Sequence, residues 1–431
     1  MSQSSRREFL GTAVAAAGTL AISRGVHTAE PAPPSELKMG VIGVGWYGMV
    51  DAKAALKVGG VKITAICDVD SDHLTKSADE LQRHQQQRPQ TFKRYEDLLD
   101  KTQLDVVVIG TPPHWHALQL LACLEHGLDV YCEKPLAYDI REGQAMVAAV
   151  RKHDQRRVQV GFQRRQSKAM QAAAEFIRAG KAGKIVQVDA RIHYRAGTND
   201  PTPQAPPPSL DWELWCGPGP KIPYSPQVGH GSWRLEKTSG HGHLVDWGIH
   251  NIDATRMMLG LGTPKQITAA GGLVKLQGKI TTPDTLTVNF EFEQLPVVWR
   301  HRIWGAVETD PDFSNGMFFY GDEATVFASD QRWVVFKEGK DTKPEEFKAD
   351  SDLGTLHMAD FLECVRSRKQ PACTVEEGFR STATVQLGML AYESGTTVRW
   401  DEKSRQIVDN PEAAKLLQRD YRPPYVHPYR A

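Results

Sequence analysis

A stretch rich in histidine and aspartate, residues 239–253, carries the densest group of side chains in this chain that could do chemistry. If it is helical from about Gly242, then His243, Asp246, His250 and Asp253 fall on one face at i, i+3 and i+4 spacings. Imidazole changes its charge near neutral pH, and a carboxylate beside it favours the protonated form. The spacing therefore predicts proton transfer by a histidine that has an aspartate close by.

A glycine motif follows a short apolar run near the start of the chain. Gly43-Val44-Gly45-Trp46-Tyr47-Gly48 is a GxGxxG pattern, and a later β-type run ends at Asp68. Here Gly43 permits a tight turn, Gly45 lets the backbone approach a pyrophosphate, and Gly48 lets helix and strand pack closely. Asp68 would accept hydrogen bonds from the adenosine ribose and repel a 2′-phosphate. The motif predicts a site for NAD in preference to NADP.

The elements that must position these residues alternate between strand and helix through about residue 160. Buried strands are expected at 104–109, 129–132 and 158–161, with helices at 117–126 and 140–153. This rhythm predicts an α/β fold that begins with a doubly wound parallel sheet. Longer alternating strands follow from residue 185, and periodicity alone leaves open whether they form an open sheet or a buried sandwich.

Further motifs make the chain resemble the Gfo/Idh/MocA oxidoreductases. Glu133-Lys134-Pro135 follows an expected strand, downstream of the Thr111-Pro112-Pro113 turn, and 246–250 is a D-x-x-x-H pattern. Residues 400–401 and 422–425 resemble the C-terminal ends of exported bacterial members. The resemblance implies an N-terminal Rossmann domain and a C-terminal α/β domain with a large open mixed β-sheet, whose exposed face commonly forms a homo-oligomer.

With that resemblance, the chain divides into four parts. We expect a signal and linker at 1–35, an NAD-binding Rossmann domain at 36–160, a substrate-binding and oligomerisation domain at 161–400, and a tail at 401–431.

The resemblance also implies catalytic roles. By analogy with inositol dehydrogenase members of the family, His250 would be the general base for a hydroxyl proton, and Asp246 would orient its imidazole. Lys134 would stabilise charge on the reacting oxygen. The implied activity is hydride transfer between a tightly bound NAD and a sugar, polyol or sugar-derived alcohol, as glucose–fructose oxidoreductase suggests.

Two sets of neighbours complete the predicted site. The expected cofactor-binding residues are Gly43, Gly45, Trp46, Tyr47, Gly48, Asp68, Thr111, Pro112, His114, Glu133 and Lys134. The expected substrate-binding residues are Gln163, Arg164, Trp233, Arg234 and His243.

Three alternatives stay open. A retained NAD that oxidises a sugar carbon only transiently would give a redox-neutral glycosidase or lyase, although the Tyr-based motif of the family's glycosidase branch is not found near residues 239–253. Zinc accepts imidazole and carboxylate, so His241, His243, Asp246 and His250 could instead form a metal site in an enzyme with little use for NAD. Ordinary family dehydrogenases carry glycine at the first two of these positions. The third alternative is a non-catalytic sugar-binding protein.

The first residues and the composition restrict location and partners. Ser5-Arg6-Arg7-Glu8-Phe9-Leu10 matches the twin-arginine signal, and the apolar stretch after it is too short to span a bilayer. This predicts recognition by the twin-arginine export machinery, a periplasmic or otherwise extracytoplasmic location and no stable membrane span.

Across 431 residues, 52 basic and 52 acidic side chains balance, so no basic field recruits nucleic acid. The six cysteines contain no CxxC pair, which argues against a zinc knuckle.

Overall fold

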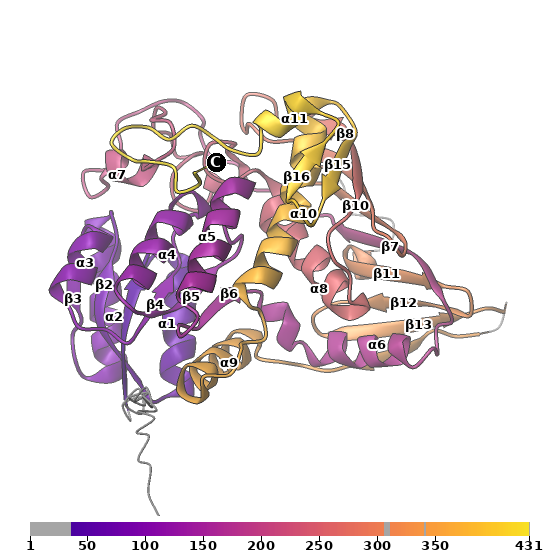
Figure 1. Cartoon of the computed structure of the whole chain (residues 1–431), viewed down its shortest axis with the longest axis horizontal. Coiled ribbons are helices and arrows are strands. Elements are labelled where there is room, and N and C mark those ends of the chain that lie inside the picture. The colour runs from indigo at the N-terminus through magenta and orange to yellow at the C-terminus, as the bar shows by residue number, and fades with distance from the viewer. Residues whose placement is uncertain (1–35, 306–310, 340–341, 431) are drawn as a thin grey trace, which may run out of the picture. The chain divides into compact units, whose positions relative to one another are not determined.

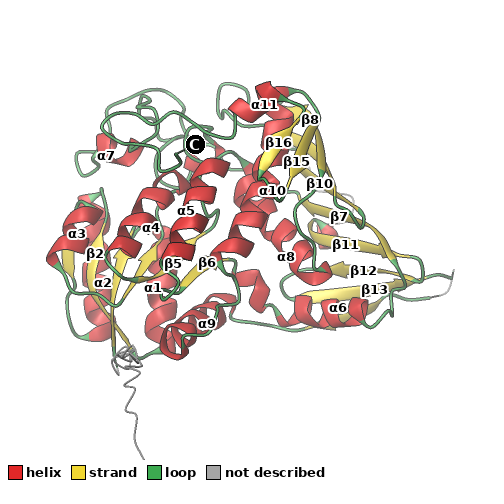
Figure 2. Ribbon diagram, in the orientation of Figure 1, coloured by secondary structure: helices red, strands yellow, loops and turns green. Residues whose placement is uncertain are grey.

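An all-parallel sheet forms the N-terminal part of the protein, with a helix between successive strands (Figures 1 and 2). The computed structural model describes residues 36–305, 311–339 and 342–430, so the export signal expected at 1–35 lies outside the described residues. The strand order is β3-β2-β1-β4-β5-β6, which is the doubly wound arrangement predicted from the sequence. The elements are β1 (Leu37–Ile42), α1 (Trp46–Val58), β2 (Val61–Cys67), α2 (Ser71–Gln85), β3 (Gln90–Phe92), α3 (Tyr95–Lys101), β4 (Val106–Ile109), α4 (His116–Glu125), β5 (Asp129–Glu133), α5 (Ile140–Lys152) and β6 (Val158–Gly161).

This sheet has a hydrophobic core on each face because its central strands are apolar on both sides. Val106 and Val108 of β4 belong to one core, which α1, α2 and α9 (Leu353–Ser367) complete. Val107 and Ile109 belong to the other core, against α4 and α5. Successive side chains of a strand point to opposite faces, so a continuous apolar run requires cover on both.

The second sheet is mixed, and it contains ten strands of the described residues. Its order is β14-β13-β12-β11-β7-β10-β9-β8-β15-β16; β10 and β7 are parallel and the other pairs are antiparallel. Along β9, Leu286, Val288 and Phe290 are buried and the residues that follow each of them are exposed, so one face is covered and the other open. The open mixed sheet is therefore confirmed. The strands are β7 (Ile185–Ile192), β8 (Gln266–Gly272), β9 (Thr285–Glu291), β10 (Pro296–Arg302), β11 (Asn315–Gly321), β12 (Ala324–Ala328), β13 (Arg332–Lys337), β14 (Glu345–Lys348), β15 (Val398–Asp401) and β16 (Gln406–Val408).

The helices of the C-terminal half do not all belong to the second sheet. Helices α6 (Lys168–Arg178), α8 (Ile249–Leu259) and α10 (Val375–Ser394) pack on the large sheet, and α10 also packs against α5. Helix α9 instead packs against α1, where Phe361 joins a core of the parallel sheet. The expected boundary at residue 400 falls inside β15, so the large sheet extends into the predicted tail.

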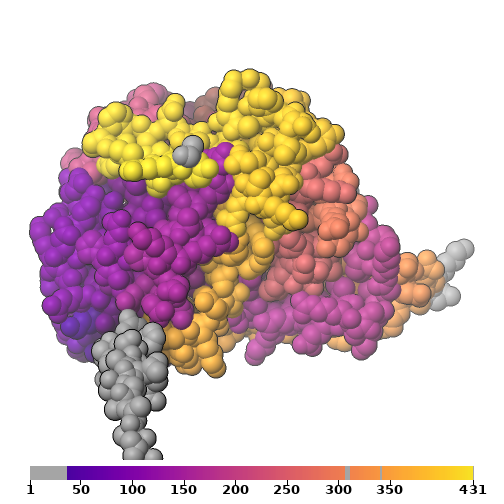
Figure 3. Space-filling model, in the orientation of Figure 1, coloured from indigo at the N-terminus to yellow at the C-terminus, as the bar shows by residue number. Residues whose placement is uncertain are grey.

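The chain's last residues lie across the N-terminal domain, as the yellow surface in Figure 3 shows. The guanidinium of Arg419 lies 2.8 Å from the Glu142 carboxylate, and Arg422 donates to the Gly217 carbonyl at 2.8 Å. Two short helices remain: α11 (Pro411–Lys415), which precedes Arg419 in the chain, and α7 (Trp212–Cys216). None of the helices in the described parts combines the length and apolar character needed to cross a membrane.

Candidate functional site

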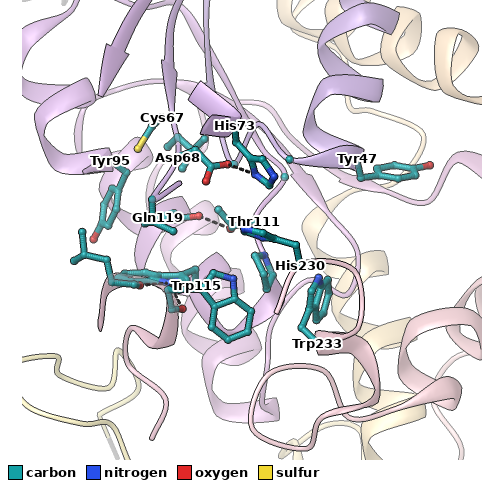
Figure 4. Close-up of a pocket in the computed structure, with 18 of the residues that line it drawn as sticks. Tyr47, Cys67, Asp68, His73, Tyr95, Thr111, Trp115, Gln119, His230 and Trp233 are labelled. Carbon is teal, nitrogen blue, oxygen red and sulfur yellow. Dashed lines mark hydrogen bonds and ion pairs between the residues drawn. The ribbon is translucent and has the colours of Figure 1, made fainter. Parts of the chain in front are cut away.

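A cavity of about 350 Å³ lies at the carboxyl edge of the parallel sheet, and Figure 4 shows residues that line it. Its walls come from the glycine motif, the ends of β2 and β4, the start of α3 and residues 214–215, 230–231 and 233–234 of the second half. The predicted cofactor residues that line it are Gly43, Gly45, Trp46, Tyr47, Asp68, Thr111 and Pro112. The glycine motif and Asp68 thus share one cavity.

The glycine motif is shaped for close backbone contact. Gly43 has φ of +85°, and a Cβ on it would lie 2.7 Å from the Thr111 nitrogen. A Cβ on Gly48 would lie 1.8 Å from the Gly43 carbonyl oxygen, so α1 can approach β1 only without a side chain there. Helix α1 begins at Trp46 with no side-chain cap and no acidic residue in its first turn. Its first N–H groups are therefore available to an anion, which fits the pyrophosphate of a dinucleotide.

Asp68 is fixed on the wall of this pocket by backbone donors. Its carboxylate accepts hydrogen bonds from the N–H groups of Val44 at 2.9 Å and Asp70 at 3.0 Å. The Nδ1 atom of His73 lies 3.9 Å from the same carboxylate, which raises the pKa of His73. Figure 4 shows Asp68 and His73 side by side. A held carboxylate suits the ribose hydroxyls of NAD.

His114 lines neither cavity described here, so its predicted contact with the cofactor is wrong. It belongs to the tight turn Pro113–Trp115, which directs its ring into the protein. Its Nε2 lies 2.8 Å from the Trp215 carbonyl oxygen, and burial lowers the pKa of His114 to about 3. The next residue, Trp115, lines the dinucleotide pocket instead, together with Trp215.

A second cavity, of about 430 Å³, holds the predicted catalytic residues Lys134, Asp246 and His250, together with Glu133. Lys134 follows the end of β5, which places it at the same sheet edge as the dinucleotide pocket. The two cavities share part of their walls. The shared lining residues are Trp46, Tyr47, Gly110, Thr111, Gly231, Trp233 and Arg234. A ligand in one cavity is therefore next to a ligand in the other.

Asp246 is held by two cations. Lys134 Nζ donates to the Asp246 carbonyl oxygen at 2.5 Å and to its Oδ1 at 3.0 Å, and Arg234 Nε donates to the same Oδ1 at 3.2 Å. Burial raises the pKa of Asp246, but Lys134 and Arg234 outweigh it and hold the pKa below its ordinary value.

The prediction that Asp246 orients the imidazole of His250 is wrong. Residues Leu244–Gly248 form a π-helical turn, which breaks the α-helical register that the prediction assumed. His250 lies in the first turn of α8, and its buried Nδ1 has no hydrogen-bond partner within the protein.

His250 is held in its neutral form. Burial, helped by the charges of Lys134 and Arg164, holds the pKa of His250 well below its ordinary value. A neutral imidazole is the form that accepts a proton, so His250 has the protonation state that a base requires.

Four of the five predicted substrate residues line the catalytic cavity: Gln163, Arg164, Trp233 and Arg234. Arg164 Nε lies 2.9 Å from the carboxylate of Asp330. The fifth, His243, was predicted wrongly. Its Nε2 lies 3.2 Å from the Ile192 carbonyl, and burial lowers its pKa to about 4. It packs behind the cavity because the turn at residues 244–248 directs it to the large sheet.

Glu133 adds a second titratable group to this cavity. Gln163 Nε2 donates to its Oε1 at 2.6 Å, and the Lys134 backbone N–H lies 3.2 Å from its Oε2. Burial raises the pKa of Glu133 to about 7, despite the lowering effect of the Lys134 charge. The carboxyl can therefore gain or lose a proton near neutral pH.

The residues proposed as alternative zinc ligands are not gathered in one place. The Nε2 of His241 lies 2.9 Å from the Tyr138 carbonyl, His243 faces Ile192, and Asp246 faces Lys134. Asp253, expected on the same face, pairs with Arg165 at 2.6 Å. In the part of the chain that the structure describes, three ligand atoms come within 4.8 Å of one another at two other clusters: Asp70–His73–His230 and Asp139–Glu142–His427. The histidine-rich stretch therefore lacks the ligand geometry for zinc.

Several lining residues were absent from the predicted sets. They are Tyr194, Trp247 and Asp330 in the catalytic cavity, and His73, Tyr95, Trp115 and His230 in the dinucleotide pocket. Trp247 lies inside the recognised D-x-x-x-H motif, so its position could have indicated it. Asp330 and His230 come from distant segments, and only the packing of the two halves brings them to the site.

Comparison with protein-family models gives two matches that together cover most of the chain. Residues 37–162 match the family model described as "Oxidoreductase family, NAD-binding Rossmann fold", and residues 174–399 match "Oxidoreductase family, C-terminal alpha/beta domain". The chain belongs to the Gfo/Idh/MocA oxidoreductase family and has its NAD-binding Rossmann domain.

Individual relatives are more distant. An inositol 2-dehydrogenase of Salmonella typhimurium is 32% identical over 172 residues, which are 39% of this chain and 50% of that protein. A glycosyl hydrolase family 109 protein of Shewanella pealeana is 33% identical over 158 residues, 32% of this chain and 35% of that protein. Their matches thus span half or less of their own length. The aldose–aldose oxidoreductase of Caulobacter crescentus, solved with glycerol, has a TM-score of 0.66 at 18% identity, over 84% of this chain and 99% of that one. This last likeness shows the fold.

Proposed function

We propose that the protein oxidises a secondary alcohol of a sugar or polyol, and reduces the corresponding ketone, with NAD(H) as hydride carrier. The observation that carries this proposal is the shared wall between the two cavities. Lys134 and His250 line a cavity whose boundary residues Trp46, Tyr47, Thr111 and others also line the dinucleotide pocket. The name of the Salmonella relative, inositol 2-dehydrogenase, supports the same class of reaction.

The chain's own residues supply the proton chemistry. The neutral imidazole of His250 takes the proton of the substrate hydroxyl. The Lys134 ammonium, fixed by two bonds to Asp246, stabilises the negative charge that develops on that oxygen. NAD, when bound, supplies the hydride acceptor. Asp246 acts by holding Lys134 in place, and Arg234 fixes the same Asp246 carboxylate oxygen.

The lining of the cavity favours a neutral, polyhydroxylated substrate. Trp233, Trp247 and Tyr194 line the cavity, and aromatic rings pack well against the C–H faces of sugars. The three cations that line the cavity are already paired, Lys134 and Arg234 with Asp246 and Arg164 with Asp330. A substrate carboxylate would therefore have to compete with a resident one.

Export is the second part of the proposal. The twin-arginine motif at Arg6-Arg7 supports recognition by an export route that carries folded proteins and so a location outside the cytoplasm. No soluble NAD pool regenerates the cofactor there, which favours a dinucleotide that stays bound and is reoxidised by a second carbohydrate. The open face of the large sheet supports a homo-oligomer, as the family resemblance suggests.

A second candidate function is redox-neutral elimination or hydrolysis at a glycoside. Glu133 favours it, because this carboxyl lines the same cavity as His250 and its pKa is raised to about 7 by burial. Glu133 is thus a second group, besides His250, that can take up a proton from a carbon next to the oxidised sugar carbon or return it. The Shewanella relative's name, glycosyl hydrolase family 109 protein, points to the same class.

One experiment separates these functions. The purified full chain is denatured to measure any retained dinucleotide, and then assayed with NAD and a panel of polyols, aldoses and aryl glycosides. We expect polyols or aldoses to reduce the nicotinamide, whether it is retained or added, and this reduction to disappear in His250→Asn and persist in His84→Asn, a variant of an exposed histidine on α2. Glycoside cleavage without net NADH favours the second candidate. A chain that neither retains nor binds NAD overturns both.

A further inference from the structure

A cluster of metal-ligand side chains lies outside the catalytic cavity, at the rim of the dinucleotide pocket. It consists of Asp70, His73 and His230, each of which offers one ligand atom within 4.8 Å of the others. The Nε2 of His230 lies 2.9 Å from Asp70 Oδ2, and the rings of His73 and His230 are 4.2 Å apart between centroids. Neither the hydride chemistry nor the glycine motif explains this group.

The cluster joins two distant parts of the chain. Asp70 caps the N-terminus of α2, and His73 lies in the first turn of that helix. His230 belongs to the irregular stretch between α7 and the turn Trp233–Leu235, and within that stretch His230 and Gly231 line the dinucleotide pocket. Both histidines line the pocket, as Figure 4 shows. An ion bound by both histidines would therefore connect the segment around His230 to the Rossmann domain.

The environment of His73 matches that of a metal ligand. Its buried Nδ1 lies 3.9 Å from the Asp68 carboxylate, with which it forms an ion pair. Metal-bound histidines commonly direct their second ring nitrogen to a carboxylate, which fixes the ring. A Cβ built on Gly45 would lie 3.6 Å from His73 Nδ1, so the ring is beside the pyrophosphate-binding loop. A cation here would be close to the phosphates of a bound dinucleotide.

The second cluster of this kind, Asp139–Glu142–His427, provides a contrast. Arg419 and Tyr421 both donate to the Glu142 carboxylate at 2.8 Å, and Asp139 accepts from the Glu142 and Arg419 backbones as well as from His427. Its ligand atoms are committed to other donors. At the rim cluster, Asp70 accepts from the Asp72 backbone through one oxygen and contacts His230 through the other.

We propose that Asp70, His73 and His230 bind one divalent transition-metal ion of the zinc class, and that this ion clasps the segment at residues 230–231 to the Rossmann domain at the rim of the dinucleotide pocket. Two imidazoles and a carboxylate are ligands that zinc accepts, with a fourth position left for water. The metal site stands on its own geometry. Its effect on retention rests on the proposed function, because it assumes that the pocket holds NAD.

The test is zinc titration of the untagged, metal-stripped full chain by calorimetry. We expect one equivalent to bind. His230→Gln keeps an amide donor for Asp70, and Asp70→Asn keeps a helix cap, so both variants should fold. Each should weaken zinc binding by more than the roughly 10- to 100-fold that loss of an outer-shell partner costs. His84→Gln, on the exposed face of the same helix, and His427→Gln, at the second cluster, should bind zinc as the unaltered chain does.

Two results overturn the proposal: no zinc bound by the unaltered chain, or zinc affinity unchanged in His230→Gln. In the first case the rim cluster is only a hydrogen-bonded contact. Cobalt is a second probe, because its visible absorption reports a four-coordinate site directly and needs no activity.

Retention of the cofactor is measured separately. The rate of NADH release, followed by its fluorescence, should fall when zinc is added to the unaltered chain and should not respond to zinc in His230→Gln. Zinc binding without any NADH binding would leave the metal site standing and remove the proposed function. If NADH binds but its release rate is the same with and without bound zinc, the proposed effect of the metal on cofactor retention is overturned.

Discussion

Replacing Lys134 with methionine isolates the charge at the centre of the catalytic cavity. Lys134 and Asp246 are 3.0 Å apart, and their side chains are 13% and 9% exposed. At an effective dielectric constant of about 20, the attraction between them is about 5.5 kcal/mol. Desolvation cancels much of that attraction, but removal of one partner leaves Asp246 charged and buried, which costs about 3 kcal/mol. Arg234, at 3.2 Å from the same oxygen, keeps the loss from being larger.

Turnover should respond more strongly than stability. Without its ammonium, the cavity lacks the cation that stabilises the reacting oxygen, and we expect kcat to fall about 100- to 1,000-fold. The affinity for NAD should not change, because Lys134 lines the catalytic cavity and is absent from the lining of the dinucleotide pocket. The rate at which substrate reduces the nicotinamide and fluorescence titration with NADH measure the two quantities.

The pH profile of the same variant gives an independent check. The Lys134 charge is one of the causes that lower the pKa of His250. Its removal should raise that pKa, so the acid limb of the turnover profile should move to higher pH.

Two variants complete this experiment. Lys237→Met removes an exposed lysine that pairs with Glu393, and should leave turnover unchanged. Lys134→Met combined with Asp246→Asn leaves no uncompensated buried carboxylate, so its stability should return towards that of the unaltered chain while turnover stays low. The reasoning is refuted if Lys134→Met keeps full turnover, or if it loses NAD affinity in parallel with turnover.

Three further predictions follow from other parts of the structure. Asp68→Ala removes a charged acceptor for the ribose hydroxyls, and hydrogen bonds to a charged group contribute about 1.5–3 kcal/mol. NAD affinity should therefore fall by about 10- to 100-fold, while NADP affinity should not fall. Titration of both dinucleotides measures this, and an equal loss of affinity for both would contradict it. Gly48→Ala places a Cβ 1.8 Å from the Gly43 oxygen, so melting temperature and NAD affinity should both drop, whereas Gly59→Ala, with nothing within 4 Å of its Cβ, should not lower NAD affinity. Burial lowers the pKa values of His114, His243 and His357 to about 3, 4 and 3, below their ordinary value of 6.5, so the unfolded chain binds protons that the folded chain does not. Stability should therefore fall as pH drops from about 6.5 towards 4, by about 1 kcal/mol per pH unit for each histidine, and urea unfolding at several pH values tests this.

Local patterns determined much of the fold. The apolar run of β4 and the glycine motif each depend on neighbours within a few residues, so the parallel sheet and its ligand-binding edge could be predicted from periodicity and turn chemistry. The open form of the large sheet came from the family resemblance, since alternation of buried and exposed residues fits a sandwich as well. Lys134 and His250 were predicted from motifs, and the structure brings both to one cavity.

The partners of those residues were decided by the tertiary structure alone. Asp246 and His250 are four residues apart, but a π-helical turn changes the helical register between them. The Asp246 carboxylate instead accepts from Lys134, which lies 112 residues earlier in the chain. His243 has the polarity of a site residue, but its imidazole is turned towards a backbone carbonyl of the large sheet. His230 reaches Asp70 across 160 residues of chain. Such contacts form only when the two halves pack, because side chains far apart in sequence exert no force on one another until the intervening elements have placed them a few ångströms apart.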